Sequence, residues 1–270
     1  MKSLLTIWLS FFCLMLNAQA PKEPFTLVKS IPVVAVDIAI DNLDNLYILT
    51  PTEQLKKLNA NGDSVAVYND VKRFGKLHSI DVSNPLKVLV YYKNFSTIVI
   101  LDRLLSLRSV IDLRKQNIIQ ASAVALSYDN NIWIFDALEN KLRKIDEFGN
   151  NLSETTDLRN ILSTPIQPSK IIDHSGLVYL YDPLNGLFAF DYYGAFKRKY
   201  PVTGFDDIAI SDKFILGTDK KNLQFFNTTN QIQQQYQFPS SFGGFQRYLV
   251  ANSKLHAIGK DSITVYSFVY

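Results

Sequence analysis

The chain has 270 residues, a formal net charge of +3 and one cysteine, Cys13. Its basic and acidic residues are interspersed, which gives no support for nucleic acid or an anionic membrane surface as a partner. No cysteine follows residue 20. The sequence therefore excludes a disulfide, a thiolate metal site and a cysteine nucleophile in that part of the chain.

Residues 1–20 have the pattern of a secretory signal peptide. Lys2 gives a basic start, an apolar stretch runs from Leu4 to Leu16, and Ala18-Gln19-Ala20 is a small-x-small cleavage site. A retained membrane anchor is the alternative, but the stretch is short for a bilayer. We therefore expect one secreted domain, residues 21–270. We place it in the periplasm, or else outside the cell, without direct membrane insertion after cleavage.

A unit of about forty residues recurs six times after this segment, and its most regular copy is Ile132–Asn150. That copy reads as an apolar strand, a polar turn, an alternating strand and a second turn. The copies align on short apolar strands that begin at Leu46, Val88, Ile132, Val178, Phe214 and Leu255. Another apolar segment precedes each of these strands, and a third follows it.

A fourth, more polar segment completes five copies, so the unit is four strands long. Six such units predict an all-β fold, a six-bladed β-propeller with four antiparallel strands per blade. An open sandwich is the alternative, which the regular spacing disfavours. The sixth copy lacks its fourth strand, and we expect Phe25–Ser30 to complete it and close the ring. A turn of helix is expected at Asn117–Ser122.

The residues Asp129–Asp136, followed by Lys141–Gly149, resemble one NHL-type repeat. Gly176–Gly194 is similar, and Asp44–Gly62 is a weaker copy. The resemblance to NHL and TolB-like six-bladed propellers covers all of residues 21–270 as architecture and about half of them as motif. That fold group includes scaffolds, carbohydrate or peptide binders, lactonases and lyases. The resemblance implies the fold and does not choose an activity.

Propeller ligands usually sit where the channel opens, on the face that carries the connections between blades. On that face, the loop Phe238–Arg247 is a candidate protein contact, because aromatic rings beside arginine favour one. The alternative is that its rings tuck between blades. The candidate surface residues are Phe238, Phe242, Phe245, Gln246 and Arg247, with Tyr92 and Phe95 at a second corner and His78 near the channel.

The sequence predicts no cofactor and no catalytic residue. Asp136 and Asp182 fall at equivalent positions, and a calcium-dependent lactonase would use such carboxylates. The alternative is that each aspartate accepts hydrogen bonds from its own turn. His78, His174 and His256 fall in different parts of three blades, so they cannot form one metal site.

The leading functional hypothesis is a non-enzymatic periplasmic propeller that binds another envelope protein or a membrane complex. It would act as a scaffold or accessory subunit in outer-membrane assembly or secretion, an idea that rests on analogy. A metal-dependent lactonase or lyase is the second hypothesis. A sensor that binds a small ligand or a glycan is the third.

Overall fold

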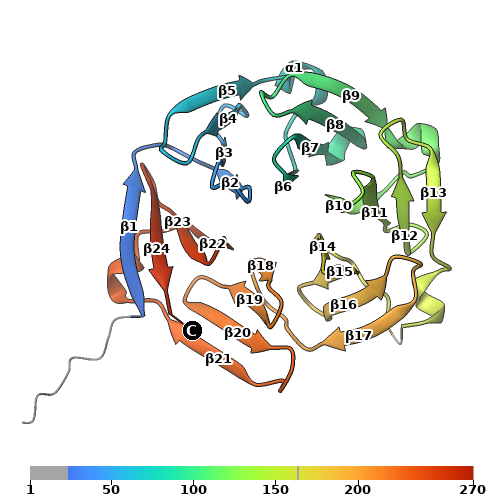
Figure 1. Ribbon diagram of the computed structural model, residues 1–270. Helices are drawn as coiled ribbons and strands as arrows, with labels where there is room; N and C mark the ends of the chain where they lie inside the picture. Colours follow the sequence, from blue (N-terminus) through green and yellow to red (C-terminus); the bar gives the residue numbers. More distant parts are fainter. Residues whose placement is uncertain (1–23, 163, 270) are drawn as a thin grey trace, which may run out of the picture.

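Six four-stranded antiparallel sheets stand around a central axis like the blades of a propeller (Figure 1). The computed structural model describes residues 24–162 and 164–269, and these form 24 strands. The predicted signal peptide lies outside the described residues. The predicted six-bladed fold is confirmed.

The blades follow one another along the chain, and each runs from an inner first strand to an outer fourth strand. Blade 1 comprises β2 (Asp37–Ile40), β3 (Leu46–Leu49), β4 (Leu55–Leu58) and β5 (Ser64–Tyr68). Blade 2 comprises β6 (Ser79–Asn84), β7 (Lys87–Tyr92), β8 (Thr97–Asp102) and β9 (Leu107–Asp112). Blade 3 comprises β10 (Ala121–Leu126), β11 (Ile132–Asp136), β12 (Lys141–Ile145) and β13 (Asn151–Glu154).

Blade 4 comprises β14 (Lys170–His174), β15 (Leu177–Asp182), β16 (Gly186–Asp191) and β17 (Phe196–Tyr200). Blade 5 comprises β18 (Asp207–Ile210), β19 (Phe214–Thr218), β20 (Asn222–Asn227) and β21 (Gln233–Gln237). Blade 6 comprises β22 (Arg247–Ala251), β23 (Lys254–Ile258), β24 (Ile263–Phe268) and β1 (Phe25–Ile31).

The first and last described strands close the ring, as the sequence predicts. β1 pairs antiparallel with β24, from Phe25 opposite Phe268 to Ile31 opposite Ile263. Across the seam between blades 6 and 1, Lys254 Nζ lies 2.6 Å from a carboxylate oxygen of Asp44. Closure matters because an open ring would expose two apolar blade faces, and without β1 the outer edge of β24 would be unpaired.

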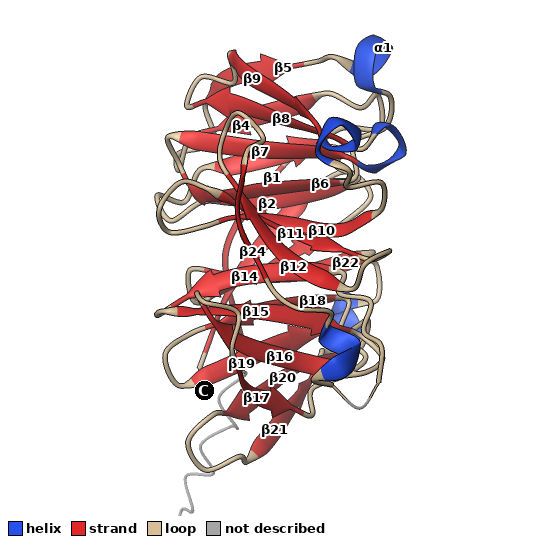
Figure 2. Cartoon of the chain, turned by 90° about the vertical axis from the view of Figure 1, so that its right-hand side faces the viewer, coloured by secondary structure: helices blue, strands red, loops and turns tan. Residues whose placement is uncertain are grey.

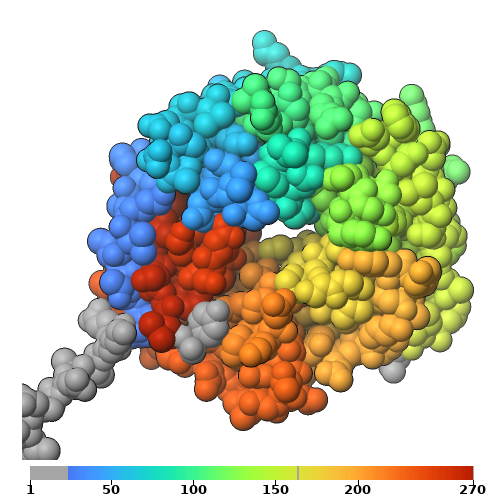
Figure 3. Space-filling model, in the orientation of Figure 1, coloured from blue at the N-terminus to red at the C-terminus, as the bar shows by residue number. Residues whose placement is uncertain are grey.

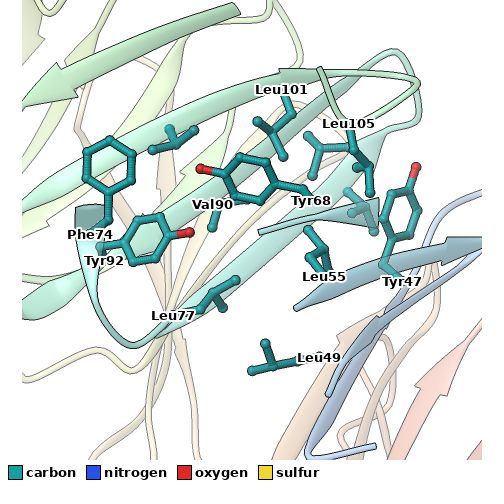
Figure 4. Close-up of a cluster of buried hydrophobic side chains, with 13 residues drawn as sticks. Tyr47, Leu49, Leu55, Tyr68, Phe74, Leu77, Val90, Tyr92, Leu101 and Leu105 are labelled. Carbon is teal, nitrogen blue, oxygen red and sulfur yellow. The ribbon is translucent and has the colours of Figure 1, made fainter. Parts of the chain in front are cut away.

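The core is divided into layers between neighbouring blades. In the second strand of blade 2, Val88 and Val90 pack toward blade 1, whereas Leu89 and Tyr91 pack toward blade 3. Figure 4 shows the layer between blades 1 and 2, where aromatic rings and leucines from both sheets interdigitate. Both faces of each inner strand are therefore apolar, which explains why these strands show continuous apolar runs instead of strict alternation.

The two faces of the disc differ. The connections between blades and the turns between second and third strands lie on one face, here called the upper face, and the remaining turns lie on the lower face. Short helices gather on the upper face, at the right in Figure 2. They are α1 (Val71–Phe74), η1 (Lys93–Phe95), η2 (Leu113–Gln116), η3 (Leu158–Asn160) and η4 (Ser240–Phe242).

The helical turn expected at Asn117–Ser122 is wrong in position. The turn is η2, which precedes that segment, because the Asp112 carboxylate accepts a hydrogen bond from the Arg114 N–H and starts it there. Asn117 ends it with a left-handed backbone, φ 58°, a conformation that asparagine tolerates better than most residues.

Candidate binding face and central channel

A channel of ≈640 Å³ runs along the axis, bounded by the first strands of all six blades. Figure 3 looks at the lower face and shows the ring open at its centre. The middle of the channel is aliphatic, with Ile80, Val124 and Ile171 among its lining residues, and its upper mouth is charged. The charged and polar residues at that mouth include Asp37, His78, Lys93, Ser122, Lys170, Asp206, Asp207 and Arg247.

Two ion pairs link neighbouring blades at the upper mouth. The Arg247 guanidinium of blade 6 lies 2.7 Å from the Asp37 carboxylate of blade 1. The Lys170 ammonium of blade 4 lies 2.9 Å from the Asp207 carboxylate of blade 5, which is buried. Each pair begins at the first residue of an inner strand, so the strand start fixes where the charge stands. The positive charge of the candidate residue Arg247 is therefore already balanced.

The loop Phe238–Arg247 does not present the aromatic surface that the sequence suggested. Phe238 and Phe242 are only 8% and 4% exposed. Phe242 packs on Phe25, with ring centroids 5.5 Å apart, and Phe238 packs on Tyr248 at 4.1 Å. The prediction that Phe238 and Phe242 are surface contacts is wrong, because the rings fill the layer between blades 5 and 6.

The other candidate surface residues differ in how exposed they are. Phe245 is half-buried beside Phe242, and Gln246 is exposed. Tyr92 is 3% exposed and belongs to the core between blades 1 and 2, so it offers no surface. Phe95, three residues later, is 44% exposed.

Asp136 and Asp182 end equivalent second strands, and each accepts hydrogen bonds from its own turn. One oxygen of Asp136 accepts the Leu138 and Glu139 N–H groups, and Arg143 pairs with the other at 3.3 Å. Asp182 accepts three backbone N–H groups and the Asn185 side chain. Burial alone would raise the pKa of Asp182, but these bonds outweigh it and lower that pKa. The aspartates thus hold turns.

Residues 24–162 and 164–269 contain no group of three or more histidines, cysteines or carboxylates that could hold a metal ion. The three histidines lie apart, as expected. His78 lines the upper mouth, whereas His174 bonds to Asp212 at 3.2 Å on the lower face. His256 is 5% exposed in β23, and burial lowers its pKa to about 4.

The sequence analysis missed a set of exposed apolar side chains on the upper face of blades 2 to 4. These residues, here called the apolar arc, are Phe95, Ile119, Leu138, Ile161 and Leu184, with exposed fractions of 44%, 63%, 57%, 44% and 87%. A signal was present, because Leu138 and Leu184 stand two residues after Asp136 and Asp182. When an aspartate accepts the N–H of that residue, the turn is fixed and the side chain is held at its tip.

Hydrogen bonds between loops connect the segments of the apolar arc. Ser96 Oγ donates to the Ile119 carbonyl, and the Ala137 N–H donates to the Gln120 carbonyl. Asn140 Nδ2 donates to the Ile166 carbonyl, and the Gln167 N–H donates to Asp182. The loops that carry Phe95, Ile119, Leu138 and Leu184 are therefore tied together in that order across three blades.

No family model matches the sequence, and no curated protein matches it. Solved structures match its shape at low identity. Virginiamycin B lyase from Staphylococcus aureus is 13% identical with a TM-score of 0.60, over 91% of this chain and 100% of that one. BamB from Moraxella catarrhalis is 15% identical with a TM-score of 0.52, over 91% and 98%. The Pan2 WD40 domain of Neurospora crassa is 13% identical with a TM-score of 0.62, over 91% and 96%.

These similarities show the fold alone. The chain is a β-propeller, and its neighbours include a lyase as well as proteins whose names state no reaction. In the described part of the chain, no helix is long and apolar enough to cross a membrane.

Proposed function

We propose that this protein is a non-enzymatic propeller of the cell envelope that binds another envelope protein through the apolar arc. In this role it is a scaffold or accessory subunit of a membrane-associated assembly or secretion machine. The NHL-like repeats and the signal-peptide pattern of residues 1–20 support a secreted binding module. The similarity to BamB is compatible with this proposal and adds only the fold.

The observation that carries the proposal is the apolar arc itself. Large apolar side chains that are exposed side by side commonly mark a protein interface. Leu184 is 87% exposed although the turn that carries it is fixed by two N–H bonds to Asp182. A turn whose backbone is held in place before binding loses little backbone entropy when a partner covers it. The proposed partner therefore presents an apolar surface to blades 2, 3 and 4.

The structure offers matched variants to test the face that binds. Leu138 and Leu184 stand at the third position of aspartate-capped turns on the upper face. Phe148 and Tyr193 stand at the same turn position on the lower face of the same two blades, with 75% and 96% exposure. Replacing either pair by serine removes two exposed apolar side chains without touching the core.

The experiment is cross-linking in the native cell envelope, followed by purification and identification of the cross-linked protein. We expect the Leu138→Ser, Leu184→Ser double variant to lose a partner that the wild type and the Phe148→Ser, Tyr193→Ser double variant both retain. Thermal unfolding of the purified variants controls for folding. Retention of every partner by the upper-face variant, or loss only in the lower-face variant, would contradict the proposed binding face.

A further inference from the structure

One residue of the channel mouth stands at an irregularity in its strand. The pairing of β10 with β11 shifts between Ala121 and Ala123, so Ser122 is bulged out of the ladder. A bulge redirects a side chain, and bulges often occur beside binding sites. Ser122 lines the channel, and its Oγ is buried without a hydrogen-bond partner in the part of the chain that the structure describes.

Two polar side chains of blade 2, His78 and Lys93, stand at the same part of the mouth. The Tyr91 ring meets the His78 ring edge-on at 5.8 Å, and its hydroxyl donates to the Ala121 carbonyl at 2.9 Å. A single tyrosine thus spans the distance from His78 to the Ser122 segment. Desolvation, together with the charge of Lys93, lowers the pKa of His78, so Lys93 acts on the same place. A neutral imidazole and an ammonium can both donate to an oxyanion.

The opposite side of the mouth carries a negative charge. Asp206 immediately precedes β18 of blade 5 and lines the channel. Blades 2 and 5 are three places apart in the ring of six, so they face each other across the axis (Figure 1). Among the described residues, neither Lys93 nor Asp206 has an ion-pair partner, whereas Arg247 with Asp37 and Lys170 with Asp207 neutralise each other.

The mouth therefore has one uncompensated cation on blade 2 and one uncompensated anion across from it. We propose that the upper mouth of the channel binds a zwitterion whose charged ends are well separated, namely a short peptide with free termini. Its carboxylate meets Lys93 and His78, and its ammonium faces Asp206. A channel of ≈640 Å³ has the size of a small-molecule site. This site is distinct from the apolar arc, so it stands or falls independently of the proposed function.

Trialanine is a suitable probe, because it is zwitterionic and has no charged side chain. The imidazole resonance of His78, assigned with the His78→Gln variant, reports binding directly. We expect a saturable shift of this resonance and a rise in the pKa of His78 as the carboxylate arrives. Trialanine with an amidated carboxyl end should give no saturable shift, and N-acetylated trialanine should bind more weakly than trialanine.

Variants test the two charged ends. Lys93→Met and Asp206→Asn should each weaken trialanine binding roughly tenfold, which corresponds to about 1.4 kcal/mol. Lys76→Met is the matched control, because Lys76 is exposed in the connection between blades 1 and 2 but does not line the channel. The proposal is overturned if trialanine gives no saturable shift, if the amide binds as well as the acid, or if Lys93→Met and Asp206→Asn both bind like the wild type.

Discussion

Replacing His256 by leucine should make the protein resist acid. His256 lies in the second strand of blade 6 on the side that faces blade 1, the side it shares with Ile258. The corresponding residues of the other blades are all aliphatic or large and aromatic, namely Tyr47, Leu89, Trp133, Tyr179 and Leu216. Neither ring nitrogen of His256 makes a hydrogen bond of ordinary geometry to the described residues. The histidine is thus a polar group in an apolar position.

The size of the effect follows from the difference in pKa between the folded and unfolded chains. Burial lowers the pKa of His256 from 6.5 to about 4. Asp44 opposes this lowering, and Lys254 and Lys29 add to it. Between these two values the unfolded chain binds a proton that the folded chain refuses, so the free energy of unfolding falls as the pH falls from 7 toward 4. The loss is about 2 kcal/mol at about pH 5 and about 3 kcal/mol below pH 4.

The assay is urea unfolding at pH 7 and pH 5, with the free energy of unfolding extrapolated to water. Wild type and His174→Gln, which alters a histidine that bonds to Asp212 on the lower face, should show the same loss of stability between these pH values. The loss should be about 2 kcal/mol smaller in His256→Leu. If His256→Leu loses as much stability on acidification as the wild type, the buried histidine does not titrate as reasoned.

Two further substitutions test how the blades are held. Gly186→Ala should destabilise the fold by about 2 to 4 kcal/mol in urea unfolding, because Gly186 has φ 110° and an added Cβ would lie 2.6 Å from the Tyr200 carbonyl oxygen. Gly176→Ala is the control for backbone strain, because Gly176 has φ 82° and nothing near its Cβ. Equal losses of stability in the two variants would refute the steric contribution. Asp173→Asn should lower the free energy of unfolding by about 3 kcal/mol. The Asp173 carboxylate on blade 4 accepts hydrogen bonds from Ser127, Tyr128 and Trp133 of blade 3 and from Tyr192. Asp212→Asn changes an exposed carboxylate and should lower the free energy of unfolding far less in the same measurement.

The sequence predicts the blades well because strand positions depend on local signals. Apolar runs and turn residues repeat at nearly constant spacing. The strand at Phe25–Ser30 precedes the first copy of the repeat, and only the sixth copy lacks a fourth strand, so the pairing of the two is the simplest assignment. In blade 5, the predicted alignment of the repeat is off by one residue. The structure places Ile215, not Phe214, at the position of Val88, since Ile215 packs toward the preceding blade. Phe214 begins β19, and an apolar residue at a strand start does not reveal which neighbour it faces.

The aromatic loop shows what local sequence cannot supply. Glycines and phenylalanines between Phe238 and Arg247 suit both an exposed binding loop and a buried plug. Whether the loop is exposed or buried depends on Phe25. This residue is more than two hundred residues away and enters the layer only when β1 closes the ring. Burial of Phe238 and Phe242 is therefore a consequence of closure, and it could be inferred only by joining the two predictions.

The turns explain how a fold this regular can acquire a specific surface. Inner strands are covered on both sides, so a change there disturbs two blades, whereas a turn tip is free to vary. Aspartate or asparagine fixes the turns that present Leu43, Leu86, Leu104, Leu138, Phe148, Leu184 and Tyr193, all exposed. On the upper face alone, the blade connections add Ile119 and Ile161 between the tips. Hydrogen bonds join these connections to the neighbouring tips, and for that reason the upper face is the stronger candidate for a partner.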